Sequence, residues 1–231
     1  MDFSGKHVVV TGGTGALGSA VVAKLLAAGA TCTVPYVHEA EAQSFSSRGD
    51  PNVTLIAVTD LADETQVVKV YADLKPWASI HIAGGFAPGT VIDTDKKQLM
   101  AQIDSNLTSC FLCCRAAAKG MSAAGGGRIV NVAARPALEW RSGAGMTAYT
   151  VAKAGVAALT VALAEEVAKS GILVNAVAPS IMDTLSNRKA MPKANFDAWP
   201  KVDEVAATIL FLASPDNRVT RGAIVPVYGK S

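Results

Sequence analysis

Short apolar runs alternate with longer segments of helical periodicity along the whole chain. The apolar runs cover residues 6–11, 30–37, 53–59, 78–84, 127–133, 172–179 and 223–228. The helical segments lie between them, near residues 16–28, 39–47, 62–75, 95–121, 146–169 and 202–213. Near-continuous apolar runs are typical of strands that are buried on both faces of a parallel sheet. The alternation therefore predicts an α/β fold with a doubly wound parallel sheet of about seven strands and helices on both faces.

The pattern is interrupted once, between residues 180 and 201. This stretch is polar and irregular and contains Pro192 and Pro200. Irregular segments of that length inside a compact domain are usually lids or binding loops. We find no sequence repeat and no linker, and 231 residues suit one α/β unit, so we predict a single domain spanning 1–231.

Composition narrows the class of protein. Half of the residues are hydrophobic and 17% are charged, which supports a large core, and the net charge of +2 without a basic block argues against nucleic-acid binding. The start "MDFSGKHVVVTGG" lacks the features of a signal peptide. We expect no apolar run of membrane-spanning length, because the best candidate, "CFLCCRAAA", is broken by Arg115. We therefore expect a cytoplasmic protein that binds neither nucleic acid nor membrane.

The four cysteines are Cys32, Cys110, Cys113 and Cys114. A C-x-x-C pair can indicate redox or metal chemistry. Here the pair lies inside a helical pattern, without a second pair or a nearby histidine. We therefore expect buried cysteines that act as small apolar residues, and no metal site.

A glycine-rich stretch, "TGGTGALGSAVVAKLLAAG", follows the first predicted strand. Gly12, Gly13, Gly15 and Gly18 stand where the chain turns tightly into a helix. Glycine lets a pyrophosphate approach the backbone, and the helix start offers free N–H groups. Its position between strand and helix favours a dinucleotide site over a plain tight turn.

The end of the second strand bears on which dinucleotide binds. A carboxylate there accepts hydrogen bonds from the ribose hydroxyls of NAD, and a cation pairs with the 2′-phosphate of NADP. The sequence "VPYVHEAEA" has Tyr36, Val37 and His38 at this place, with neither group. Glu39 or His38 could substitute or could simply begin the next helix, so the choice of cofactor stays open.

The stretch "TAYTVAKAG" places Tyr149 and Lys153 four residues apart. On a helix these side chains are neighbours on one face. Taken alone, the stretch also fits an ordinary helix with one aromatic and one charged residue.

Taken together, "TGGTGALG", "HIAGG", "SNLTS" and "AYTVAK" resemble the classical short-chain dehydrogenase/reductase family. The resemblance implies a Rossmann-type sheet, NAD or NADP as cofactor, and hydride transfer to or from a small-molecule substrate. Tyr149 would be the acid/base, Lys153 would bind the nicotinamide ribose and lower the phenol pKa, and Asn106 would hold a proton-relay water. It also implies a homodimer or homotetramer, formed through helices at about 100–120 and 149–168.

The same resemblance assigns residues to the cofactor from the glycine loop, the strand ends and the segment after the sixth strand. They are Gly12, Thr14, Gly15, Ala16, Leu17, Gly18, Tyr36, Asp60, Leu61, Ala83, Gly84, Gly85, Lys153, Pro179, Ile181 and Thr184. Asp60 could equally cap a helix that begins near Ala62. Two positions depart from the family pattern, because His81-Ile82 replaces an Asn-Asn pair and Ser180 replaces a glycine.

A further departure concerns the serine that binds the substrate oxygen in this family. Ala133 and Ala134 stand at its place after the fifth strand, and Ser142 is too far along the chain to take the role. Losing one such donor typically costs about 10²–10³ in rate. Either the substrate needs no such donor, or the chain is a weak catalyst, and a nucleotide-binding regulator is then the alternative.

A narrower resemblance favours a substrate that needs no such donor. "GGTGALGS", "AGGF" and the segment 183–199 resemble the dihydropteridine reductases, members of the family that also lack the serine. Their substrate is a quinonoid dihydropterin, and Phe86 stands where they have a tryptophan near the pterin. Phe86, Ala134 and Trp199 are accordingly the expected substrate residues.

Overall fold

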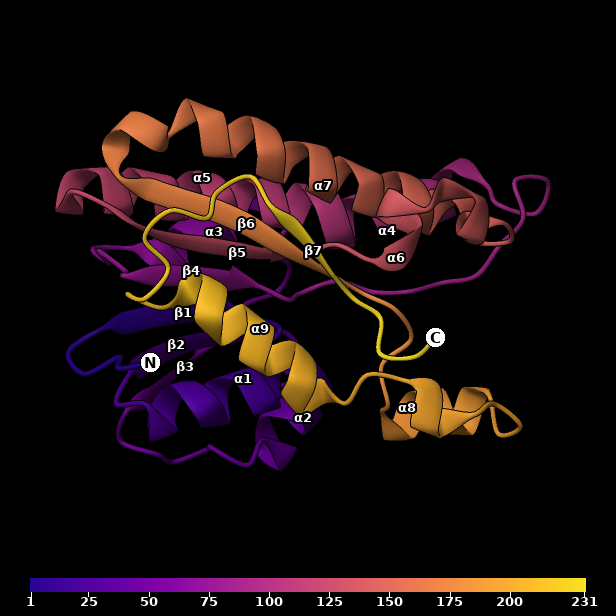
Figure 1. Cartoon of the computed structure of the whole chain (residues 1–231), viewed down its shortest axis with the longest axis horizontal. Coiled ribbons are helices and arrows are strands. Elements are labelled where there is room, and N and C mark those ends of the chain that lie inside the picture. Colours follow the sequence, from indigo (N-terminus) through magenta and orange to yellow (C-terminus); the bar gives the residue numbers. More distant parts are fainter.

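The computed structural model describes residues 1–231 and contains one parallel sheet of seven strands, in the order β3-β2-β1-β4-β5-β6-β7 (Figure 1). The strands are β1 (His7–Thr11), β2 (Thr31–Tyr36), β3 (Val53–Ala57), β4 (Ala78–His81), β5 (Gly127–Val132), β6 (Ile172–Pro179) and β7 (Ile224–Val227). Each lies within a predicted apolar run, which confirms the predicted Rossmann-type α/β fold.

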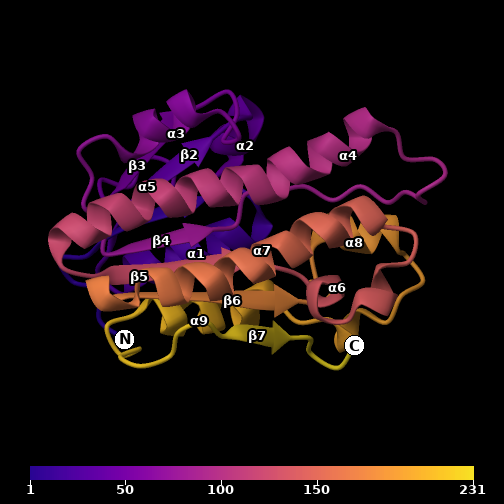
Figure 2. The same ribbon diagram turned by 90° about the horizontal axis from the view of Figure 1, so that it is seen from above.

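Helices cover both faces of the sheet, as Figures 1 and 2 show. On one face α1 (Ala16–Ala27) packs against α9 (Val202–Ala213); on the other lie α3 (Glu64–Tyr71), α5 (Ser109–Ala124) and α7 (Thr147–Glu166). The short helix α2 (Glu39–Ser44) follows β2. Side chains of a strand alternate between the faces, so Val8 and Val10 enter the α1/α9 core while Val9 enters the α3/α5/α7 core.

The segment 95–121, predicted as one helix, has a defect in its middle. It consists of α4 (Lys96–Ile103), a π-helical turn (Asp104–Thr108) and α5. Asp95 caps α4 in a capping box with Gln98, and the π turn contains the buried Asn106. Single π turns inside α-helices are frequent at functional sites.

The segment 180–201 is more ordered than the sequence indicates. It contains α8 (Leu185–Ala190) and a 3₁₀ turn (Phe196–Ala198). The Asp183 carboxylate binds both Arg188 and Lys201, and its backbone N–H donates to the Pro200 carbonyl oxygen (2.9 Å). The two ends of the segment are therefore held together. The segment is therefore irregular only in part, and its order depends on a pairing of residues 18 positions apart.

The expectation that no apolar segment reaches membrane-spanning length is wrong. By length and composition, α7 is apolar and long enough to cross a membrane. Its buried residues, which include Ala152, Val156, Ala157, Thr160 and Ala164, contact the sheet and neighbouring helices. Its apolar composition therefore fits a helix that covers the core, while Val151 and Val161 are exposed.

Candidate active site

A cleft of about 490 Å³ opens at the carboxyl ends of β1, β2 and β4. The strand order reverses around β1, and such switch points are where doubly wound sheets bind ligands. Twelve of the predicted cofactor residues line this one cleft: Gly12, Thr14, Gly15, Ala16, Leu17, Gly18, Tyr36, Asp60, Leu61, Ala83, Gly84 and Gly85. The structure also adds residues that the sequence did not single out, among them Glu41, Ser105, Ser109 and Met182.

The glycine loop fits a pyrophosphate group. Gly12 has a positive φ of 66°, and a Cβ atom there would stand 2.7 Å from the Ala83 backbone nitrogen. A Cβ atom on Gly18 would stand 2.0 Å from the Gly12 carbonyl oxygen. No side chain caps the N-terminus of α1, and its first turn carries no acid. The loop thus offers a close-packed turn and free N–H groups to an anion.

The side of the cleft that borders β2 carries acids instead of cations. The Thr14 hydroxyl donates to the Glu41 carboxylate (3.2 Å), and Asp60 also lines the cleft. No lysine or arginine lines it. The nearby Arg48 is paired with Glu39 at 3.4 Å. Glu41 is not among the expected residues, which are Glu39 and His38, although it stands in the same first turn of α2 as Glu39.

Asp60 does not cap α3. It accepts a hydrogen bond from the Ala62 backbone N–H (2.8 Å), whereas the cap of α3 is Asp63, which accepts from Thr65. The expected helix start near Ala62 is therefore two residues early. Asp60 remains in the wall of the cleft, where the family resemblance placed it.

Tyr149 and Lys153 lie together on α7, with the ammonium nitrogen 5.9 Å from the centroid of the phenol ring. Lys153 Nζ donates to the Val132 carbonyl oxygen (2.8 Å). Burial raises the pKa of Tyr149 to about 12 and lowers the pKa of Lys153 to about 8. The expected lowering of the phenol pKa by Lys153 is absent, since desolvation is the dominant effect on both groups.

Asn106 is held rigidly beside this pair. Its Nδ2 donates to the carbonyl oxygens of Gly85 (2.9 Å) and Gln102 (3.1 Å), while its Oδ1 is buried without a partner. A Cβ atom on Gly84 would stand 2.5 Å from that Oδ1 and 3.6 Å from Lys153 Nζ. Gly84 therefore joins the cleft to the two polar groups, and an unsatisfied buried acceptor there is available to a ligand or water.

Phe86 comes directly after the cleft and contacts Tyr149. The two rings are 5.1 Å apart and nearly perpendicular, at 88°. The side chain of Phe86 is half exposed, at 58%. It therefore forms an apolar wall on one side of the candidate acid/base.

The remaining predicted residues lie outside the cleft. Pro179 ends β6 and is buried, Ile181 is exposed, and Thr184 caps α8 by accepting from Asn187. Trp199 is buried and packs on Phe196 within the segment 180–201. From this segment only Met182 reaches the cleft lining.

Ala134 brings no hydroxyl to the position of the family serine. It is buried and precedes α6 (Arg135–Leu138), a short helix that the sequence analysis did not predict. The Ser142 hydroxyl donates to the Glu139 carbonyl oxygen (2.8 Å) and does not replace the serine.

The expectation that no histidine lies near the cysteine pair is wrong. His81 at the end of β4 lies against Cys110 and Cys114 of α5, with 3.4 Å between its Nδ1 and the Cys114 sulfur. His81 and Cys114 are 33 positions apart in the sequence and meet because α5 packs over β4. His81 also bonds Asn131, its register partner on β5.

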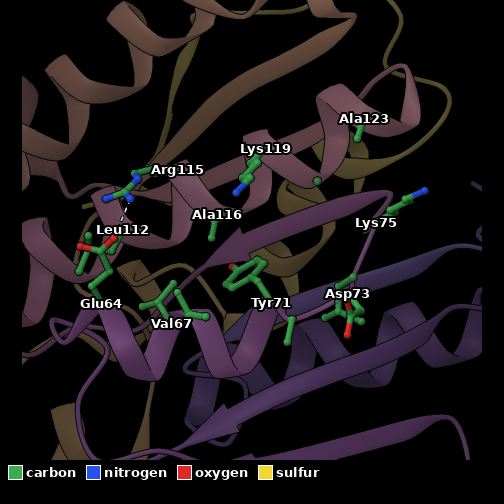
Figure 3. Close-up of a pocket in the computed structure, with 14 residues that line it drawn as sticks. Glu64, Val67, Tyr71, Asp73, Lys75, Leu112, Arg115, Ala116, Lys119 and Ala123 are labelled. Carbon is green, nitrogen blue, oxygen red and sulfur yellow. Dashed lines mark hydrogen bonds and ion pairs between the residues drawn. The ribbon is translucent and has the colours of Figure 1, made fainter.

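A second hollow, of about 530 Å³, lies between α3 and α5, away from the candidate acid/base (Figure 3). An ion pair between Glu64 and Arg115 (2.6 Å) bridges it. Tyr71 lines it, but the Tyr71 hydroxyl bonds Ser79 (2.7 Å) inside the core.

Comparisons with known proteins place the chain among enzymes. A family model described as short chain dehydrogenase matches residues 6–195. The chain is 30% identical to a 3-oxoacyl-(acyl-carrier-protein) reductase of Pseudomonas aeruginosa, over 99% of this chain and 98% of the relative. It is 35% identical to a galactitol 2-dehydrogenase of Rhizobium johnstonii, over 96% and 93%. A solved oxidoreductase of the same class from Burkholderia thailandensis is 28% identical with a TM-score of 0.87, over 97% and 91%.

Proposed function

The chain belongs to the short-chain dehydrogenase/reductase family, and from this membership we propose an NAD(P)-dependent oxidoreductase of one domain that acts on a small molecule. The observation that carries the proposal is the placement of Tyr149 and Lys153. Lys153 Nζ lies beside Gly84, which lines the cleft, and the Tyr149 ring is the neighbour of Lys153 on α7. An acid/base next to a dinucleotide cleft is the arrangement that coupled hydride and proton transfer requires.

Each residue of the site has its own role in the proposed reaction. The bound nicotinamide would supply or accept the hydride. With a pKa of about 12, the Tyr149 phenol holds its proton at neutral pH and donates it to the substrate atom that gains charge. The Lys153 ammonium is held by its hydrogen bond to the Val132 carbonyl oxygen. The Asn106 amide oxygen, which has no partner, lies with this ammonium beside Gly84. Residues of the cleft hold the dinucleotide.

Within this proposal the cleft prefers NAD to NADP. Glu41, oriented by Thr14, supplies the carboxylate that β2 lacks and accepts hydrogen bonds from the ribose hydroxyls. A 2′-phosphate would meet Glu41 and Asp60 without any lysine or arginine in the lining. Like charges in a partly enclosed cleft repel, so the phosphate is disfavoured.

The proposed substrate is one that tolerates Ala134. Quinonoid dihydropterin is the specific candidate, because an activated ring accepts hydride with little isolated oxyanion charge. The buried alanine and the aromatic wall of Phe86 favour it. A β-ketoacyl thioester or a ketose, suggested by the two relatives, is the competing choice.

The proposed assembly is a homodimer or homotetramer formed through α5 and α7, which lie side by side in Figure 2. Phe111, Val151 and Val161 are between 44% and 51% exposed on these helices. Apolar patches on adjacent helices mark protein interfaces. Light scattering at micromolar protein concentration tests this, and a monomeric mass contradicts it.

The function is tested by binding and turnover measured separately. NADH and NADPH binding is followed by fluorescence, and oxidation of each is followed with dihydropterin, a β-ketoacyl thioester and a ketose. We expect turnover that Tyr149→Phe lowers by about 10²–10⁴ while cofactor affinity is unchanged. Binding without turnover of any substrate would favour the regulator. Failure to bind either cofactor would overturn the proposal.

A further inference from the structure

A set of four metal-ligand donors converges in the core behind the cofactor cleft. They are His81 Nδ1 from β4, the sulfurs of Cys110 and Cys114, one turn apart on α5, and Asn131 Oδ1 from β5. All four side chains are buried, with His81 3% and Cys114 1% exposed. The proposed oxidoreductase chemistry uses none of them.

These donors are crowded around one atom. His81 Nδ1 lies 2.8 Å from Asn131 Oδ1, and each of the two sulfurs lies 3.4 Å from the same oxygen. An amide oxygen has two lone pairs, so it cannot accept fully from three donors. A cation that takes the place of these three protons removes this conflict and turns the oxygen into a ligand.

The spacing suits a tetrahedral ion. Four of the six separations between donor atoms are 2.8–3.4 Å, and the nitrogen and both sulfurs lie within 4.8 Å of one another. Metal–ligand bonds of the usual zinc lengths imply separations of about 3.3–3.8 Å around a tetrahedron. The three printed sulfur separations already lie in this range, and the His81 and Asn131 atoms need to move apart by about half an ångström.

The second ring nitrogen of His81 is also held as a ligand histidine requires. Its Nε2 lies 2.8 Å from the Ser79 hydroxyl and 3.3 Å from the Tyr71 hydroxyl. In the metal-free protein Nδ1 carries the proton that it donates to Asn131 Oδ1. With the proton on Nε2 instead, the ring can donate to either hydroxyl, and Nδ1 is then free for a metal. Such partners fix the ring and its tautomer at metal sites.

We propose that His81, Cys110, Cys114 and Asn131 bind one zinc ion as a closed structural site. On binding, both thiols release their protons to solvent, the imidazole proton moves from Nδ1 to Nε2, and two metal–sulfur bonds form without any change of oxidation state. A dication with two thiolates, a neutral imidazole and an amide has no net charge, so its burial carries no unpaired charge. All four positions are filled by protein, which is typical of structural sites.

The position of the site in the fold shows what separates it from the surface and what a bound ion would stabilise. Tyr71 separates it from the hollow between α3 and α5, and Figure 3 shows the Tyr71 ring between these helices. The bound ion would tie β4, β5 and α5 together and so stabilise the fold.

The test measures metal content and spectra of the full-length protein without an affinity tag that binds metal. We expect about one zinc per chain by mass spectrometry. After chelation, cobalt should restore thiolate charge-transfer and tetrahedral absorption bands, and zinc should raise Tm. Cys110→Ser and Cys114→Ser should each weaken cobalt binding by about tenfold or more.

Cys113→Ser is the matched control. Cys113 is buried on the same helix, but it lies beside Tyr71 and outside the donor set, so this variant should keep the metal signal. Protein that purifies without metal, shows no cobalt bands and gains no Tm from zinc would overturn the proposal. NADH binding is measured in parallel, and it does not depend on this outcome.

Discussion

The ring of Phe86 stands edge-on to the ring of Tyr149, with centroids 5.1 Å apart and planes at 88°. Such aromatic pairs contribute about 0.5–1.5 kcal/mol beyond the area that they bury. The contact joins the loop after the cleft to the helix that carries the candidate acid/base. It therefore shields the phenol and fixes its orientation.

Removing this contact should lower the pKa of the Tyr149 phenol. In Phe86→Ala we expect the pKa of Tyr149 to fall from about 12 toward its ordinary value, because water reaches the ring. The free energy of unfolding should fall by about 1 kcal/mol. Ultraviolet titration, with Tyr149→Phe as background, measures the pKa. Phe86→Leu, which keeps an apolar wall, should shift it less, and an unchanged titration would contradict the shielding role.

Glu41 should set the choice of cofactor. We expect wild-type protein to bind NADH at least about tenfold more tightly than NADPH, because the cleft lining carries acids and no cation. Glu41→Gln should narrow that ratio, and Glu41→Lys should reverse it. Dissociation constants from cofactor fluorescence give the answer without turnover. Glu64→Gln, the same change at an exposed acid outside this cleft, should leave the ratio as it is. Equal affinities in the wild type would refute the role of Glu41.

The pH dependence of kcat/KM should follow the protonation state of Lys153. Its pKa is lowered to about 8, so its ammonium form is present below that pH and lost above it. Tyr149 keeps its proton throughout, since its pKa is raised to about 12. We therefore expect kcat/KM for reduction to be level below about pH 8 and to fall tenfold per unit above it. In Lys153→Arg the fall should move to higher pH, because a guanidinium stays charged. A wild-type decline that begins only above pH 10 would contradict this assignment.

A serine at position 134, as in the family pattern, should increase activity on simple ketones. Ala134 precedes α6 at its N-cap, where alanine is a poor residue. In Ala134→Ser we expect reduction of simple ketones to rise by up to about 10²–10³, since a hydroxyl can then bond the developing oxyanion. Steady-state kinetics on a ketone and on dihydropterin test this. Ala133→Ser is the control: Ala133 packs in the α3/α5/α7 core, so a hydroxyl there should lower stability without adding activity. Equal kinetics in the two variants would exclude the oxyanion role.

The sequence alone determined the strands, most helices and the glycine-lined half of the cleft. Those features depend on local rules: apolar runs make buried strands, and glycines mark the turn into α1. Because parallel strands end at one edge of the sheet, the loops after β1, β3 and β4 had to meet. The spacing of Tyr149 and Lys153 likewise follows from one helix.

Only the tertiary structure decided which distant side chains meet. His81 and Asn131 pair because β4 and β5 are neighbours in that register, and α5 then lays Cys110 and Cys114 over them. Glu41 reaches Thr14 because α2 folds back beside the glycine loop. Burial raised the pKa of Tyr149, against the lowering that the family resemblance implied, and lowered the pKa of Lys153. Strand order, register and desolvation are properties of the packed chain, and no local pattern encodes them.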